Sequence, residues 1–271
     1  TVMDRNDYKE IIKLTVSKSI MSFFQNKEVK VSHPLDLIFP RERQIRSLIG
    51  GLETSLGTQV WEPLAKMFAK NNGFNVLDEK KFNLSVPIIP NALEHEISDF
   101  ENKKLDDPTL KHSTFKEGII EFINSNNIKS YSRRKMQKGE GVDIWLQKND
   151  EEFLIDIKTV QLNSGGGPKF NKNLLKWYTY RALDVGGDFN TKCMLTFPFN
   201  PHNRDYWQKE GSKVSPLIFS REALVGNEFW DLLSGKENTM ELIFDAFKEL
   251  GNENFGSKFD HIFNLKKNNL L

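Results

Sequence analysis

The sequence predicts an α/β protein, because helical patterns near both ends of the chain enclose strand patterns in its middle. Apolar residues recur at helical spacing in residues 7–24 and again in residues 239–250. Residues 142–146 alternate between apolar and polar side chains, and residues 153–160 form a second strand-like run. The polar segment 148–151 lies between these two runs. A short polar turn between two strands predicts a β-hairpin.

Further elements are expected on both sides of this hairpin. Helices are expected at residues 41–56, 60–71, 114–125, 174–183 and 227–233. Short strands are expected at residues 74–77 and 193–199. Residues 94–107 hold six acids and two lysines, so we expect a solvated loop or helix surface there. No long linker divides the chain, which favours a single domain spanning residues 1–271 with peripheral helices.

Composition excludes several classes of protein. The chain has 271 residues, and its 38 basic and 37 acidic residues leave a formal net charge of +1. A single cysteine, Cys193, excludes an internal disulfide framework and indicates a reducing, cytoplasmic setting. No run approaches the roughly 18 apolar residues that a membrane helix needs, so no membrane partner is expected. The polar N-terminal residues do not look like a signal peptide.

Three charged residues of the hairpin form the candidate site. Asp156 and Lys158 are two apart on one strand, so their side chains project from the same face. Pairing of the strands can bring Asp143 to that face. Two carboxylates buried in an apolar sheet need compensation, and Mg²⁺ prefers such oxygen ligands. A lysine beside that ion could orient a water molecule. The alternative is a structural ion pair at the edge of the sheet.

The residues around this triad resemble the PD-(D/E)XK nuclease signature. Segment 141–144 carries the first aspartate and segment 153–159 carries the Asp-Ile-Lys triplet, although Val142 stands where the family often has proline. The resemblance implies a restriction-endonuclease-like fold, in which helices flank a central mixed sheet, with a catalytic core at about residues 58–200. The chain length and the order of helix, hairpin, basic loop and helix look like those of a type II restriction endonuclease.

The resemblance also implies roles for individual residues. Asp143, Asp156 and the carbonyl of Ile157 would bind Mg²⁺, and Lys158 would position or activate the attacking water. An acid on an upstream helix often joins the site in this family, and Glu62 stands in such a helix. An exposed helix glutamate with no catalytic role is the other interpretation of Glu62. A homodimer would cut both strands of a short, symmetric double-stranded DNA site and leave 5′-phosphate ends.

The net charge of +1 hides two basic segments that flank the triad. Residues 129–138 and residues 158–181 each contain five basic residues and no acid. Clustered cations near the chemistry are what phosphate binding requires. The candidate DNA-binding residues are Arg133, Arg134, Lys135, Lys138, Lys169, Asn171, Lys172, Asn173 and Lys176. The arginines could read guanine and the asparagines adenine, although phosphate contacts or a solvated charged loop are the simpler roles.

Two other functions remain open from the sequence. A DNA repair or junction-resolving nuclease would share the same hairpin and the same triad. A DNA-binding module without catalysis would use the carboxylates as a structural ion pair and would show no metal dependence.

Overall fold

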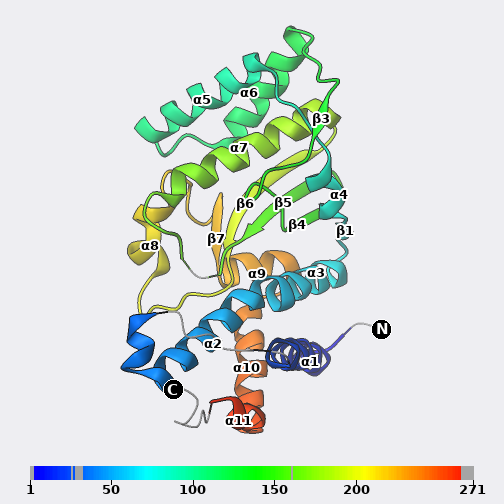
Figure 1. Cartoon of the computed structure of the whole chain (residues 1–271). Coiled ribbons are helices and arrows are strands. Elements are labelled where there is room, and N and C mark those ends of the chain that lie inside the picture. Colours follow the sequence, from blue (N-terminus) through cyan, green and yellow to red (C-terminus); the bar gives the residue numbers. More distant parts are fainter. Residues whose placement is uncertain (1–2, 26, 28–32, 160, 264–271) are drawn as a thin grey trace. The chain divides into compact units, whose positions relative to one another are not determined.

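The structure is a computed structural model, and it describes residues 3–25, 27, 33–159 and 161–263 (Figure 1). These residues divide into two compact units. The first unit holds the chain up to residue 64 together with residues from 238 onward, and the second unit holds residues 65–237. A single domain over the whole chain stays a prediction. No helix in the described ranges is long and apolar enough to cross a membrane.

The second unit is built on a five-stranded mixed sheet with the order β1-β4-β5-β6-β7. Its strands are β1 (Asn75–Leu77), β4 (Ile144–Lys148), β5 (Glu151–Ile157), β6 (Asn190–Phe197) and β7 (Ala223–Val225). The pairs β1-β4 and β4-β5 are antiparallel, whereas β5-β6 and β6-β7 are parallel. The predicted hairpin is therefore confirmed, and Asn149 in its two-residue turn adopts φ 55°. β5 begins two residues before the expected strand at 153–160 and ends at Ile157, and Val160 lies outside the described residues.

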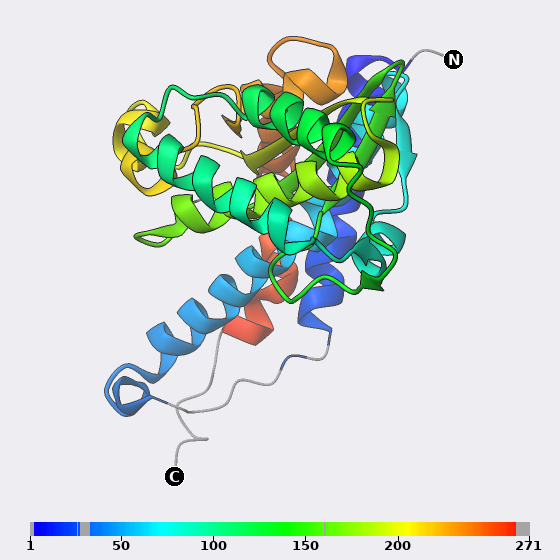
Figure 2. The same ribbon diagram turned by 90° about the horizontal axis from the view of Figure 1, so that it is seen from above.

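Helices cover the sheet, and this confirms the expected α/β fold. In Figures 1 and 2, α5 (Asn91–Asp106) and α6 (His112–Ser125) lie against α7 (Gly166–Val185). Trp177 and Leu174 of α7 share a buried cluster with Leu154 of β5 and Leu195 of β6. The acid-rich segment 94–107 is mostly α5, whose Leu93, Ile97 and Phe100 are buried under a charged outer surface.

The second unit also contains five shorter elements. They are α4 (Glu79–Leu84), β2 (Val86–Pro87), β3 (Arg133–Arg134), α8 (Tyr206–Val214) and α9 (Asn227–Ser234), of which only α9 is predicted. Asp78 caps α4 by accepting the Lys80 N–H at 3.1 Å. The strands β2 and β3 pair with each other in a two-stranded sheet. A strand of two residues is too short to show a period, so only the structure reveals this sheet.

The first unit is helical. It contains α1 (Arg5–Phe24), η1 (Pro34–Leu37), α2 (Pro40–Leu56), the π-turn η2 (Gly57–Trp61), α10 (Thr239–Asn252), η3 (Phe255–Phe259) and α11 (Asp260–Phe263). Lys9 of α1 pairs with Glu249 of α10 at 2.5 Å, and Phe24 packs on Phe259 with ring centroids 4.9 Å apart. Helices α1, α2 and α10 are the extra N- and C-terminal helices that the sequence predicts. Helix α3 (Glu62–Asn71) begins in the first unit and continues into the second.

Candidate active site

Asp143 lies one residue before β4, where the hairpin ladder is interrupted. Ile155 pairs with Ile144 in the ladder, and its carbonyl also accepts the Asp143 N–H at 3.0 Å. Two residues of one strand thus oppose one residue of the other, the arrangement of a β-bulge, which re-aims side chains next to active sites. The Asp143 carboxylate oxygen Oδ2 accepts the Ile157 N–H at 2.8 Å. This bond fixes Asp143 beside the end of β5.

Asp156 and Lys158 occupy the end of β5. Asp156 is 2% exposed, and Lys158 follows the last residue of the strand. The Lys158 N–H donates to the Thr196 carbonyl at 2.8 Å, which continues the pairing with β6. Lys158 Nζ lies 2.5 Å from Asp156 Oδ1 and 4.7 Å from the centre of the Phe170 ring. The structure therefore brings together the three side chains that the sequence singles out.

Burial raises the pKa of both carboxyl groups, because it disfavours their charged forms. Burial raises the pKa of Asp156 to about 7; the Asp143 carboxylate adds to this rise, and Lys158 opposes it. Burial also raises the pKa of Asp143, against the lowering effect of the Ile157 N–H and of Lys158. One ammonium group therefore does not compensate two buried carboxylates.

The oxygen atoms at this point suit a divalent cation. Asp156 Oδ1 is buried and has no hydrogen bond of good geometry in the described part of the chain, since Lys158 Nζ approaches it at a poor angle. No three His, Cys, Asp or Glu side chains among the described residues gather closely enough to hold a metal. Two carboxylates and the Ile157 carbonyl are hard oxygen donors of the kind that Mg²⁺ takes, with water completing its shell. The residues fit Mg²⁺.

Two glutamates, Glu62 and Glu79, are further candidate acids of the site, and Glu79 has an electrostatic effect on Asp143. Glu62 begins α3, is half-buried and belongs to the first unit, so its place in the site stays a prediction. Glu79 of α4 is 9% exposed and pairs with Lys66 at 2.9 Å. Its charge contributes to the raised pKa of Asp143. The sequence did not single out Glu79, because its acid-x-lysine triplet is one of several in the chain.

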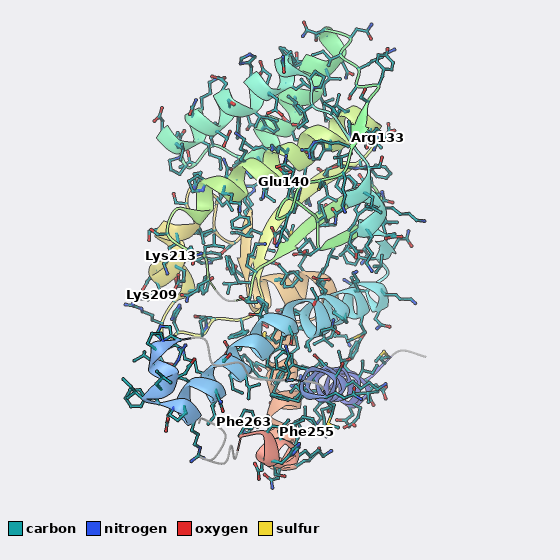
Figure 3. All side chains as sticks on the ribbon, viewed as in Figure 1. Arg133, Glu140, Lys209, Lys213, Phe255 and Phe263 are labelled. Carbon is teal, nitrogen blue, oxygen red and sulfur yellow. The ribbon has the colours of Figure 1, made fainter. Side chains whose placement is uncertain are left out.

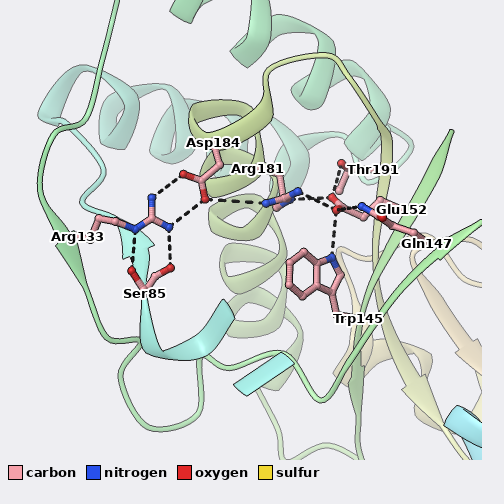
Figure 4. Close-up of polar contacts among 8 residues, drawn as sticks. All are labelled: Ser85, Arg133, Trp145, Gln147, Glu152, Arg181, Asp184 and Thr191. Atoms are coloured by element: carbon pink, nitrogen blue, oxygen red, sulfur yellow. Dashed lines mark hydrogen bonds and ion pairs between the residues drawn. The ribbon is translucent and has the colours of Figure 1, made fainter. Parts of the chain in front are cut away.

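Several of the candidate DNA-binding cations are engaged by acids (Figures 3 and 4). The Arg133 guanidinium donates to Asp184 at 2.7 and 3.1 Å and also to Ser85. Glu140 lies beside α7 and pairs with both Arg134, at 3.3 Å, and Lys176, at 3.0 Å. These acids stand outside the two acid-free segments in sequence. In the folded chain, Asp184 and Glu140 nevertheless pair with these basic residues.

The remaining candidates divide into buried and exposed residues. Asn171 is 1% exposed and contacts His112 Nε2 through its Oδ1 at 2.7 Å. Asn173 is 6% exposed, and its Nδ2 donates to the Gly139 carbonyl at 3.1 Å. These buried amides do not support the prediction that the asparagines read adenine. Lys172 pairs with Glu101 at 3.3 Å.

Three of the candidate lysines, Lys135, Lys138 and Lys169, are exposed and have no acidic partner among the described residues. Lys169 Nζ lies 5.9 Å from the centre of the Phe170 ring, the same ring that Lys158 approaches. Lys169 therefore stands beside the candidate active site.

The mixed sheet flanked by helices is consistent with the restriction-endonuclease-like fold. Residues 4–251 match the family described as "Type II restriction endonuclease, HinfI", and the chain belongs to this family. The chain is also similar to the type II restriction enzyme MjaII of Methanocaldococcus jannaschii, with 26% identity over 229 residues. That match covers 78% of this chain and 56% of MjaII, so the chain spans little more than half of that relative's length. No solved structure matches the chain.

Proposed function

We propose that the chain is a Mg²⁺-dependent endonuclease that cuts both strands of duplex DNA at a specific sequence. The observation that carries this proposal is the buried pair Asp143 and Asp156 with Lys158 beside it, where one cation is too few for two carboxylates. Membership of the HinfI family supports the same conclusion. The activity of the related MjaII, whose name describes a type II restriction enzyme, is consistent with it.

Each group of the site has a defined task in this proposal. Asp143, Asp156 and the Ile157 carbonyl would hold Mg²⁺, which supplies positive charge that stabilises the developing charge on the phosphate. Lys158 Nζ, on a side chain that is 29% exposed, hydrogen-bonds the attacking water and orients it. The water oxygen bonds to phosphorus as the bond from phosphorus to the 3′ oxygen breaks. The products are a 5′-phosphate and a 3′-hydroxyl.

The exposed lysines bind the substrate in this proposal. Lys135, Lys138 and Lys169 contact phosphates next to the scissile bond, where ionic contacts provide affinity without sequence information. Arg133, Arg134, Lys172 and Lys176 would exchange their acidic partners for DNA. A homodimer presents two such sites, one for each strand of a symmetric duplex sequence.

The triad is tested with one substitution and a matched control. Asp156→Ala should abolish cleavage of duplex DNA in Mg²⁺ while leaving duplex binding in EDTA intact. Asp150→Ala removes an exposed acid from the turn of the same hairpin and should leave cleavage unchanged. Cleavage by Asp156→Ala at the wild-type rate would show that the site is wrongly assigned. Sequencing the ends of digested DNA reports the recognition site and the stagger of the cut.

The ion pair between Asp156 and Lys158 favours one alternative, a DNA-binding module without catalysis. This module would bind duplex DNA equally well with and without Mg²⁺ and would never cut it. A repair or junction-resolving nuclease would instead nick DNA according to its structure. Discrete, sequence-dependent fragments from plasmid DNA distinguish a restriction enzyme from both alternatives.

A further inference from the structure

The segment before Asp143 is clamped by one side chain of α4. Asn83 Nδ2 donates to the Val142 carbonyl, and Asn83 Oδ1 accepts the Val142 N–H, both at 2.8 Å. The amide thus makes with Val142 the two hydrogen bonds that a neighbouring strand would make. Val142 is 2% exposed, so water does not readily replace these bonds if the amide is removed. The clamp is a feature of the buried main chain.

The neighbouring glycine fits the same clamp. A Cβ added to Gly141 would lie 3.1 Å from Asn83 Nδ2 and 3.3 Å from its Cγ. Either the amide or the 141–143 main chain would have to move by a few tenths of an ångström. Glycine at this position lets the Asn83 amide lie directly against the chain.

The clamp acts where the site has little other support. The next residue, Asp143, stands at the β-bulge, where its N–H donates to the Ile155 carbonyl and its carboxylate accepts the Ile157 N–H. Asn83 itself is fixed from the far side, because its carbonyl accepts the Met136 N–H at 2.9 Å. One residue of α4 thus joins the basic segment near β3 to the main chain that carries Asp143.

We infer that Asn83 is a positioning residue for the metal ligand Asp143, and that it acts through the main chain of Val142. This inference rests on the proposed function, in which Asp143 binds Mg²⁺. Groups that orient a metal ligand typically change metal affinity or activity by about 10- to 100-fold when they are replaced. Asn83 makes no contact with substrate or metal in this role.

The test compares Mn²⁺ binding, followed by the EPR signal of the free ion, with single-turnover cleavage over a range of Mg²⁺ concentrations. Asn83→Ala should weaken Mn²⁺ binding and raise the Mg²⁺ concentration for half-maximal cleavage by about 10-fold or more. Duplex binding in EDTA should not change. Asn126→Ala is the matched control, because Asn126 also donates to a main-chain carbonyl, that of Phe122, at the end of α6. It should match the wild type in both measurements.

A double-mutant cycle keeps the inference falsifiable if Asn83→Ala folds poorly. Gly141→Ala presses on the same amide and should also weaken Mn²⁺ binding, but it should add little to Asn83→Ala, where the space is open. Wild-type Mn²⁺ binding by Gly141→Ala, or by a folded Asn83→Ala, would overturn the inference. Asp143→Asn distinguishes failure of the proposed function from failure of the Asn83 inference. If Asp143→Asn still cleaves DNA, the proposed function is wrong. If Asp143→Asn is inactive and Asn83→Ala behaves like the wild type, only the role of Asn83 is wrong.

Discussion

Two buried carboxylates of β5, Glu152 and Asp156, lie four residues apart on the same face of the strand, yet their surroundings are opposite. Glu152 is fully buried, and its two oxygens accept five hydrogen bonds (Figure 4). The donors are Arg181 Nε at 2.8 Å, Arg181 Nη2 at 2.9 Å, Thr191 Oγ1 at 3.0 Å, Trp145 Nε1 at 3.1 Å and Gln147 Nε2 at 3.3 Å. Among the described residues, Asp156 Oδ1 faces the Lys158 ammonium at a poor angle, and the neighbouring Asp143 carboxylate adds to the raised pKa of Asp156.

The difference shows which acid is structural and which is reserved for another partner. Glu152 receives all its bonds from the protein, as a buried acid must if nothing else is to bind it. Asp156 is equally buried but lacks this network, and its raised pKa records the deficit. An incomplete buried site of this kind is typical of a ligand position. The contrast is the physical case for a cation at Asp156 rather than a structural ion pair.

The largest effect expected from this comparison concerns stability. Glu152→Gln removes the nearest countercharge of the buried Arg181 guanidinium, which keeps only the more distant Asp184 at 3.9 Å among the described acids, and it should lower the free energy of unfolding by about 3 kcal/mol. Asp156→Asn removes a poorly compensated charge and should not destabilise the metal-free protein. Denaturant unfolding at neutral pH measures both. Equal destabilisation by the two substitutions would break the comparison, because Asp156 would then be structural.

A smaller effect is expected in the pH dependence of the metal-free protein. The pKa of Asp156 rises from the usual 3.8 to about 7 on folding, so the folded state holds this proton more tightly than the unfolded chain. Its stabilising contribution is therefore complete below pH 3.8 and is lost as the pH rises through about 7. Melting temperatures of the wild type minus those of Asp156→Asn should fall across this range, and Mg²⁺ should oppose the fall. A flat difference curve would contradict the raised pKa.

The smallest effect concerns the cations, which show the same contrast. Arg133 is linked through Asp184 to Arg181 and Glu152 (Figure 4). Lys169, in contrast, has no acidic partner among the described residues. Lys169→Gln should reduce the slope of log K against log salt for duplex binding by about 0.9, the value for one phosphate contact. Lys103→Gln, which alters a lysine paired with Asp99 on α5, serves as the control. An unchanged slope for Lys169→Gln would remove this lysine from the DNA contacts.

The sequence predicted the hairpin and the proximity of its three charged residues because both depend on local features. A period of two, a short polar turn and the spacing of Asp156 and Lys158 are all properties of adjacent residues. The bulge at Asp143 was not predicted, because it depends on how two strands meet. The same holds for α4 and β2, whose few residues have no period and are fixed by tertiary bonds such as that between Ser85 and Arg133.

Charge pairing was the least predictable part of the site. The two basic segments contain no acid, yet Asp184, Glu140 and Glu101 each reach one or more of their cations in the fold. These partners are remote or lie just beyond the segment boundaries, so a count along the chain does not find them. Burial of Asn171 and Asn173 was hidden for the same reason, since α7 is covered on more than one side and the two amides contact different segments, Asn171 reaching His112 and Asn173 the Gly139 carbonyl.

The two-residue turn of the hairpin has a consequence for tolerance to insertions. Asn149 and Asp150 are exposed and polar, and a surface turn of this kind is usually where a chain accepts extra residues. Here the turn length sets the register, and a shift by one residue would exchange the faces of the sheet. Asp143 and Asp156 would then part, although they lie about 20 Å from the turn along strands that rise about 3.3 Å per residue. Insertion of a single residue into this turn should therefore reduce DNA cleavage as strongly as a substitution in the active site.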